Sequence, residues 1–151
     1  DALTGIGNRR HADRALATLG PGDGLAMIDL DHFKKVNDRY GHAVGDRVLF
    51  DLATFLAHTI RDGDTVARFG GEEFLIVMKR VGDQAGPTVE RLAQGWRDLD
   101  PITSFSAGVA THINDETAPE TLARADAAMY EAKRAGRNRV VIADGAAAET
   151  G

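Results

Sequence analysis

The sequence contains no cysteine in 151 residues, and this absence removes several classes of protein at once. Without thiols the chain can form neither a disulfide framework nor a thiolate metal site, and a reducing compartment is the default. No apolar run approaches the roughly 20 residues that span a bilayer, and no signal peptide opens the chain. We therefore expect a cytoplasmic domain that makes no membrane contact.

The chain also lacks an excess of basic residues, because 23 acidic residues outnumber 18 lysines and arginines. The formal net charge is −5 and the isoelectric point is about 5.5, which argues against general binding to nucleic acid. A chain of 151 residues suits one domain, which can bury about 70% of its unfolded surface without disulfides or structural metals. We expect the domain to cover residues 1–143 and the Gly/Ala-rich tail, 144–151, to be disordered.

Two apolar runs, 65–69 and 74–78, lie on either side of a Gly-Gly pair. This pattern predicts a β-hairpin with a two-residue glycine turn, because glycine tolerates the positive φ that such turns require. The adjacent acids Glu72 and Glu73 are unusual there, because neighbouring carboxylates repel each other. Residue chemistry alone leaves both a functional pair and a solvated turn open.

A second acidic stretch follows the apolar residues 25–28. Side chains alternate along a strand, so Asp29 shares a face with Leu25 and Met27. An acid that continues an apolar face needs a partner, because a buried unpaired charge is costly. A cation held by Asp29 and the hairpin acids would supply one, and oxygen ligands of this kind suit Mg²⁺.

The remaining pattern alternates helices with strands and predicts an α+β fold, an α/β sandwich with helices packed on a central mixed sheet. The segment 31–45 is polar and is expected to be irregular, and 82–87 is expected to be a loop. The expected helices are 8–19, 46–60, one marked by apolar residues between 89 and 99, and one from Pro119; the expected strands are 25–30, the two hairpin strands, 102–110 and 138–143.

At this point a family resemblance emerges. The run Gly70-Gly71-Glu72-Glu73-Phe74 resembles the signature of the GGDEF domains, the bacterial diguanylate cyclases, in its GGEEF form. Four further stretches resemble motifs of that family, in order along the chain: 1–10, 29–34, 37–42 with 45–46, and 132–138. One small departure is Gly7, where the family usually has proline.

The resemblance implies the polymerase-palm or class III nucleotidyl cyclase fold, related to the ferredoxin-like βαββαβ motif, with five strands. It also implies a reaction in which two GTP molecules condense to the second messenger cyclic di-GMP and two pyrophosphates. In this reading Asp29, Glu72 and the carbonyl of Leu30 hold two Mg²⁺ ions per GTP site, with Mn²⁺ as an alternative, and Glu73 adds ligand charge. Glu72 is also the candidate base for the attacking 3′-hydroxyl.

The same resemblance assigns substrate contacts. Asn37 and Asp46 match the residues that read guanine, and His42 matches a substrate contact. Lys34, which we group with the catalytic residues, matches a triphosphate contact, as do Lys133 and Arg137. Without the family, Asn37 would be a loop residue, Asp46 a helix N-cap, and the basic run near 133–139 a solvated helix end.

Feedback control and partners complete the expectation. Arg61 and Asp64 match the Arg-x-x-Asp site at which cyclic di-GMP inhibits such cyclases, and Arg91 is a candidate for the partner surface. A homodimer is expected to be required, because two GTP molecules must meet, and fusion to an upstream sensory or regulatory domain is expected. The alternative is a non-catalytic module that senses GTP or cyclic di-GMP. The sequence has no phosphate-binding Gly-x-x-x-x-Gly-Lys loop.

Overall fold

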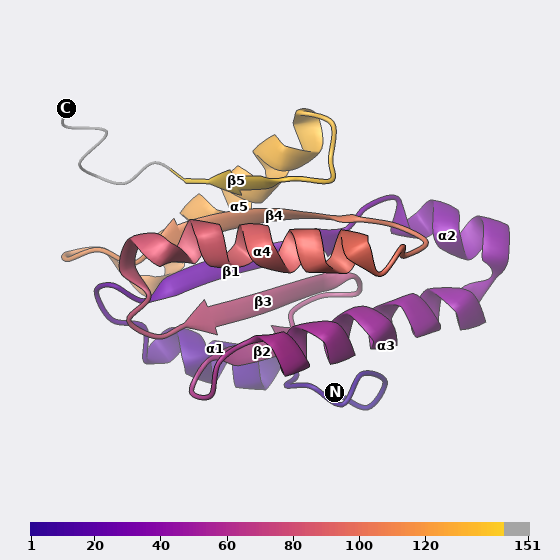
Figure 1. The fold of residues 1–151 in the computed structure, drawn as a ribbon. Coiled ribbons are helices and arrows are strands. Elements are labelled where there is room, and N and C mark those ends of the chain that lie inside the picture. Colours follow the sequence, from indigo (N-terminus) through magenta and orange to yellow (C-terminus); the bar gives the residue numbers. More distant parts are fainter. Residues whose placement is uncertain (144–151) are drawn as a thin grey trace.

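The computed structural model describes residues 1–143, which form one five-stranded sheet with helices on both faces (Figure 1). The strand order is β2-β3-β1-β4-β5, and every neighbouring pair is antiparallel except β4 and β5, so the predicted mixed sheet is confirmed. The strands are β1 (Gly24–Leu30), β2 (Thr65–Arg68), β3 (Glu73–Met78), β4 (Phe105–Thr111) and β5 (Val140–Ile142). The disorder expected for residues 144–151 lies outside the described residues.

In the described part of the chain, five α-helices and one 3₁₀ turn, η1 (Gly82–Gln84), surround this sheet. Figure 1 shows α3 and α4 in front of the sheet and α1 and α5 behind it. Within residues 1–143, no helix combines the length and the apolarity needed to cross a bilayer. The α-helices are α1 (Arg9–Ala17), α2 (Phe33–Tyr40), α3 (His42–Thr59), α4 (Ala85–Asp98) and α5 (Ala118–Arg134).

The central strand β1 is buried along its whole length because helices cover both of its faces. Ala26 and Ile28 pack into the core under α3 and α4, whereas Leu25 and Met27 pack with residues of α1 and α5. The alternation of side chains thus divides the apolar residues between two cores. Asp29 continues the α5 side of the strand, as its position in the sequence predicted.

The prediction that 31–45 is irregular was wrong. Most of the segment is helical: α2 begins at Phe33, and α3 begins at His42, four residues earlier than expected. The helix α2 buries only Phe33 and Val36, so its apolar pattern is too sparse to identify it in the sequence. Gly41 separates the two helices with φ of +91°, a backbone conformation that favours glycine.

Two other element boundaries also differ from the prediction. The segment 82–87 is not a loop, because η1 leads directly into α4 and Pro87 lies in the first turn of that helix, where proline is tolerated. The strand expected at 102–110 is β4, which begins at Phe105. Ile102 precedes it and is 53% exposed.

Candidate active site

Three acidic residues meet at one end of the central strand. Asp29 lies opposite Glu73 in the β1–β3 register, and the backbone N–H of Leu30 donates to the carbonyl of Glu72 at 3.2 Å. The hairpin turn therefore lies beside the end of the first strand. Residues more than forty positions apart in the sequence thus form one acidic cluster.

Asp29 is buried and has one cationic partner. Only 7% of the residue is exposed, and its Oδ2 lies 2.9 Å from Nζ of Lys133, near the end of α5. Its other oxygen, Oδ1, is buried and has no hydrogen-bond partner among residues 1–143. A buried acceptor of this kind is rare and costly, so the atom is suited to a ligand.

The cluster carries more negative charge than Lys133 can neutralise. Burial raises the pKa of Asp29, and Lys133 opposes this effect. Burial also raises the pKa of Glu72 and that of Glu73, and the charge of Asp29 raises both further. The ionised forms are thus disfavoured until a positive charge joins them.

The donor set fits a magnesium-type ion, since all of its atoms are carboxylate or carbonyl oxygens. The unpartnered Oδ1 of Asp29 supports this fit. In the present side-chain conformations, residues 1–143 contain no assembled group of three His, Cys, Asp or Glu side chains that could hold a metal. The residues therefore supply the ligand chemistry of such an ion without forming an assembled metal site.

The hairpin turn differs from the prediction. It contains four residues, 69–72, because β2 ends at Arg68 and β3 begins at Glu73. Neither Gly70 nor Gly71 has φ in the left-handed region, so positive φ does not explain the glycines. Space explains Gly70: a Cβ there would lie 2.4 Å from Oε1 of Glu73, whereas a Cβ on Gly71 would meet no atom within 4 Å.

Arg68 supports this turn, although the sequence analysis did not single it out. Its Nη2 donates to the carbonyl of Gly71 at 2.7 Å, and its Nη1 lies 3.4 Å from Oδ2 of Asp1. The same Asp1 oxygen accepts from the backbone and the hydroxyl of Thr4. The N-terminal motif is thereby tied to the acidic turn. The signal available in the sequence was the position of Arg68 directly before the aromatic-Gly-Gly run.

The two candidate guanine readers come together on neighbouring helices. Asn37 lies in α2, and its buried Oδ1 has no hydrogen-bond partner in the part of the chain that the structure describes. A Cβ on Gly45 would lie 1.8 Å from that oxygen, so Asn37 packs directly against the residue that precedes Asp46. Asn37 is therefore not a loop residue, and Asp46 is not an N-cap, because it is the fifth residue of α3.

The other predicted substrate contacts surround the same end of the sheet. Lys34 is exposed on α2, and His42 is the exposed first residue of α3. Lys133 contacts Asp29 directly, as described above. Arg137 is half-buried in the turn between α5 and β5.

Both residues of the expected feedback site, Arg61 and Asp64, line one cavity of about 280 Å³. Arg61 forms a two-bond contact with Asp64, at 3.1 and 3.2 Å, and Oδ1 of Asp64 also accepts from the N–H of Lys79. Arg91, which was a candidate for the partner surface, lines the same cavity from α4 of this chain. Arg61 and Arg91 thus lie at one cavity within the chain, a proximity that the sequence could not show.

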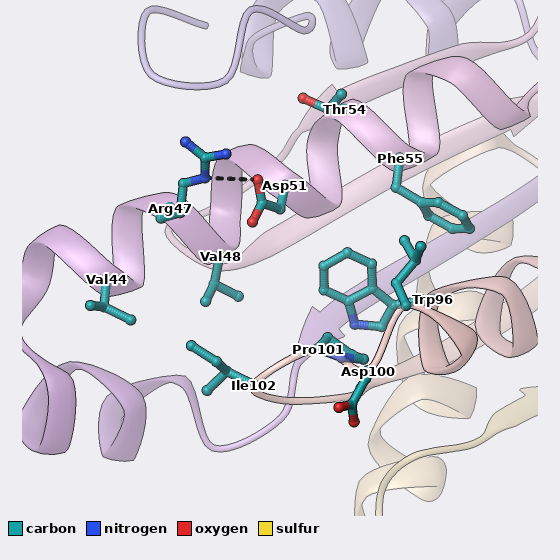
Figure 2. Close-up of a pocket in the computed structure, with 11 residues that line it drawn as sticks. Val44, Arg47, Val48, Asp51, Thr54, Phe55, Trp96, Asp100, Pro101 and Ile102 are labelled. Atoms are coloured by element: carbon teal, nitrogen blue, oxygen red, sulfur yellow. Dashed lines mark hydrogen bonds and ion pairs between the residues drawn. The ribbon is translucent and has the colours of Figure 1, made fainter.

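A larger apolar cavity, of about 650 Å³, lies elsewhere, between α3, α4 and the loop after α4. Figure 2 shows Phe55 and Trp96 on its walls and the ion pair of Arg47 with Asp51 beside it. None of the predicted site residues lines this cavity. Cavity size therefore does not locate the acidic site in this fold.

Comparison with known proteins gives a consistent result. The family described as "Diguanylate cyclase, GGDEF domain" matches residues 1–139. Diguanylate cyclase DgcZ of Escherichia coli K12 is 40% identical to this chain over an alignment of 161 residues, gaps included. The alignment covers 95% of this chain and 53% of DgcZ. This chain thus spans about half the length of that relative.

Two solved structures show the same fold. The GGDEF domain of DgcB from Caulobacter crescentus, solved in complex with c-di-GMP, has a TM-score of 0.86 and 33% identity over 96% of this chain and 93% of that one. The active GGEEF domain of a diguanylate cyclase from Vibrio cholerae has a TM-score of 0.81 and 34% identity over 93% of this chain and 99% of that one. Together with the acidic site, these matches show that the chain belongs to the GGDEF family of diguanylate cyclases.

Proposed function

We propose that this chain condenses two GTP molecules into cyclic di-GMP and releases two pyrophosphates. The observation that carries the proposal is the acidic cluster of Asp29, Glu72 and Glu73, with the unpartnered oxygen of Asp29 at its centre. The relatives named as diguanylate cyclases support the same reaction.

The acidic cluster is the proposed metal centre. Asp29, Glu72 and the carbonyl of Leu30 would hold two Mg²⁺ ions, or Mn²⁺, and Glu73 would add negative charge. When bound, such ions promote loss of the proton from the 3′-hydroxyl and stabilise negative charge at the α-phosphate. Glu72 is also the proposed base, because a carboxylate of this cluster can accept the proton of the attacking 3′-hydroxyl.

Guanine recognition is assigned to Asn37 and Asp46. The unpartnered Oδ1 of Asn37 can accept from an N–H group of the base, and the carboxylate of Asp46 can accept two more. Lys34, Lys133 and Arg137 supply positive charge for the triphosphate. His42, at the start of α3, is the remaining proposed substrate contact.

The reaction requires two copies of the chain. Each site would hold one GTP, and each new phosphodiester needs a hydroxyl from one site and an α-phosphate from the other. A two-fold dimer with facing sites is the simplest closed arrangement. Because DgcZ is about twice as long as this chain, we also propose that this domain is fused to a regulatory domain. The use of GTP as a substrate favours a cytoplasmic location.

Product feedback is assigned to the cavity of Arg61, Asp64 and Arg91. An arginine can bind a phosphate or the Hoogsteen edge of guanine through two bonds, and an aspartate can accept from guanine N–H groups. Cyclic di-GMP bound there would link this domain to another and keep the catalytic faces apart.

The test is to incubate the protein with GTP and Mg²⁺ and to separate the products by chromatography, with Asp29→Asn as the matched variant. We expect cyclic di-GMP from the parent and none from Asp29→Asn, while circular dichroism shows that both are folded. GTP binding without turnover would instead identify a sensing module. Full turnover by Asp29→Asn would overturn the metal assignment.

A further inference from the structure

The turn that carries Arg137 has an unusual backbone. Helix α5 ends in a Schellman motif, in which Gly136 N–H donates to the Lys133 carbonyl and Arg137 N–H to the Ala132 carbonyl. The next two residues, Arg137 and Asn138, then have φ of +66° and +50°. Two consecutive residues with a Cβ in this region are unfavourable, so other contacts must hold the turn.

One of these contacts comes from the strand end that carries the acidic site. Asp31 is 1% exposed, and its Oδ2 accepts from the backbone N–H of Asn138 at 2.9 Å. The hydroxyls of Ser104 and Ser106 each donate to the same carboxylate at 2.6 Å. Asp31, two residues after Asp29, is therefore fixed by Ser106 of β4 and by Ser104 just before that strand, and it anchors Asn138.

A second contact comes from α4 on the other side. Nε of Arg97 donates to the side-chain oxygen of Asn138 at 2.8 Å, and Nη2 donates to its backbone carbonyl at 3.3 Å. Gln94 accepts from the remaining nitrogen at 3.2 Å, which orients the guanidinium group. Asn138 is thus held at its N–H, its carbonyl and its side chain.

We propose that Asp31 and Arg97 are positioning residues that clamp Asn138 and thereby aim Arg137 at the triphosphate of GTP. The Schellman motif fixes the backbone before Arg137, and the clamp fixes it immediately after. Arg137 can then contact phosphate without first ordering its own turn, which makes binding tighter. The ligand in this inference rests on the proposed function, whereas the clamp itself rests on the contacts above.

Arg97→Ala is the informative variant, because Arg97 is only half-buried and its removal leaves the core intact. Arg134→Ala is the matched control, since it removes an exposed arginine from the last turn of α5. Calorimetry on the 151-residue chain would compare a non-hydrolysable GTP analogue with guanosine. We expect Arg97→Ala to bind the analogue about tenfold more weakly and guanosine unchanged, as for loss of one oriented charged contact. Arg134→Ala should match the parent.

A double variant and an exchange measurement complete the test. If Arg97 acts through Arg137, Arg97→Ala with Arg137→Ala should bind the analogue no more weakly than Arg137→Ala alone. The amide of Asn138 should exchange faster with solvent in Arg97→Ala. Additive losses, an equal loss for guanosine, or unchanged exchange would each overturn the clamp. A parent that binds no GTP analogue would overturn the proposed function and the ligand assigned here, while exchange would still decide whether Arg97 orders the turn.

Discussion

Glu116, in the loop between β4 and α5, should make the fold sensitive to acid. Its carboxylate accepts from Nε and Nη2 of Arg124 at 2.6 and 2.7 Å and from the hydroxyl of Thr121 at 2.7 Å. The Arg124 contact is the main cause that lowers the pKa of Glu116 from 4.5 to about 2. The perturbation that tests this network is Glu116→Gln, which keeps the shape and removes the charge.

The magnitude follows from linkage. The difference between 4.5 and about 2, at 1.36 kcal/mol per pH unit, corresponds to about 3 kcal/mol of folding stability. Only 10% of the side chain is exposed, so water screens the pair weakly. A lowered pKa in the folded state means that this stability is present above pH 4.5 and is lost as the pH falls toward 2. Glu116→Gln should therefore cost about 3 kcal/mol at pH 7 and almost nothing near pH 2.

Urea unfolding followed by the fluorescence of Trp96, which is buried at 3% exposure, provides the assay. At pH 7 the midpoint of Glu116→Gln should lie about 1–3 M below that of the parent, and the two should converge as the pH falls. Glu131→Gln, an exposed carboxylate on α5, is the control and should change stability by less than about 0.5 kcal/mol. A difference between Glu116→Gln and the parent that stays constant from pH 7 to pH 3 would refute the reasoning.

Three further predictions concern catalysis. Gly70→Ala should lower kcat roughly 100-fold, because the new methyl group displaces the Glu73 carboxylate. Gly71→Ala has room for its methyl group and should keep a kcat close to that of the parent. Equal kcat values for the two variants would remove the spatial argument. Specific activity should rise with protein concentration, because two copies form one reaction site, and a flat dependence across the monomeric range would contradict the dimer. Arg61→Ala should keep the initial rate of the parent and lose tight binding of cyclic di-GMP. Calorimetry would measure the binding, and inhibition curves would measure its effect on the rate. Product inhibition as strong as that of the parent would show that Arg61 is only a turn residue.

The strands and the position of Asp29 were predictable because period-two alternation and a run of apolar residues are local signals. The helix α2 was not, since Phe33 and Val36 are its only buried residues. The reason for Gly70 was also misjudged: the residue leaves room for a side chain three positions away rather than adopting a left-handed backbone.

Contacts between distant segments account for most of what the sequence could not supply. Lys133 was predicted as a phosphate contact. Its ion pair with Asp29 depends on how α5 lies across the sheet, which the sequence does not show. Asp31 bonds to Ser106 and Asn138, 75 and 107 positions away, and no local pattern indicates such partners. The family resemblance gave Arg61, Arg91 was a candidate for the partner surface, and the packing of α4 brings both into one cavity.

The central claim is that the chain synthesises cyclic di-GMP, and the stoichiometry of its products tests this most directly. GTP and Mg²⁺ would be added to the 151-residue chain, and pyrophosphate and cyclic di-GMP would be measured in the same samples over time. The proposed reaction predicts two pyrophosphates released for each cyclic di-GMP formed, with no GDP. Release of GDP and phosphate, or binding of GTP with no product at all, would contradict it.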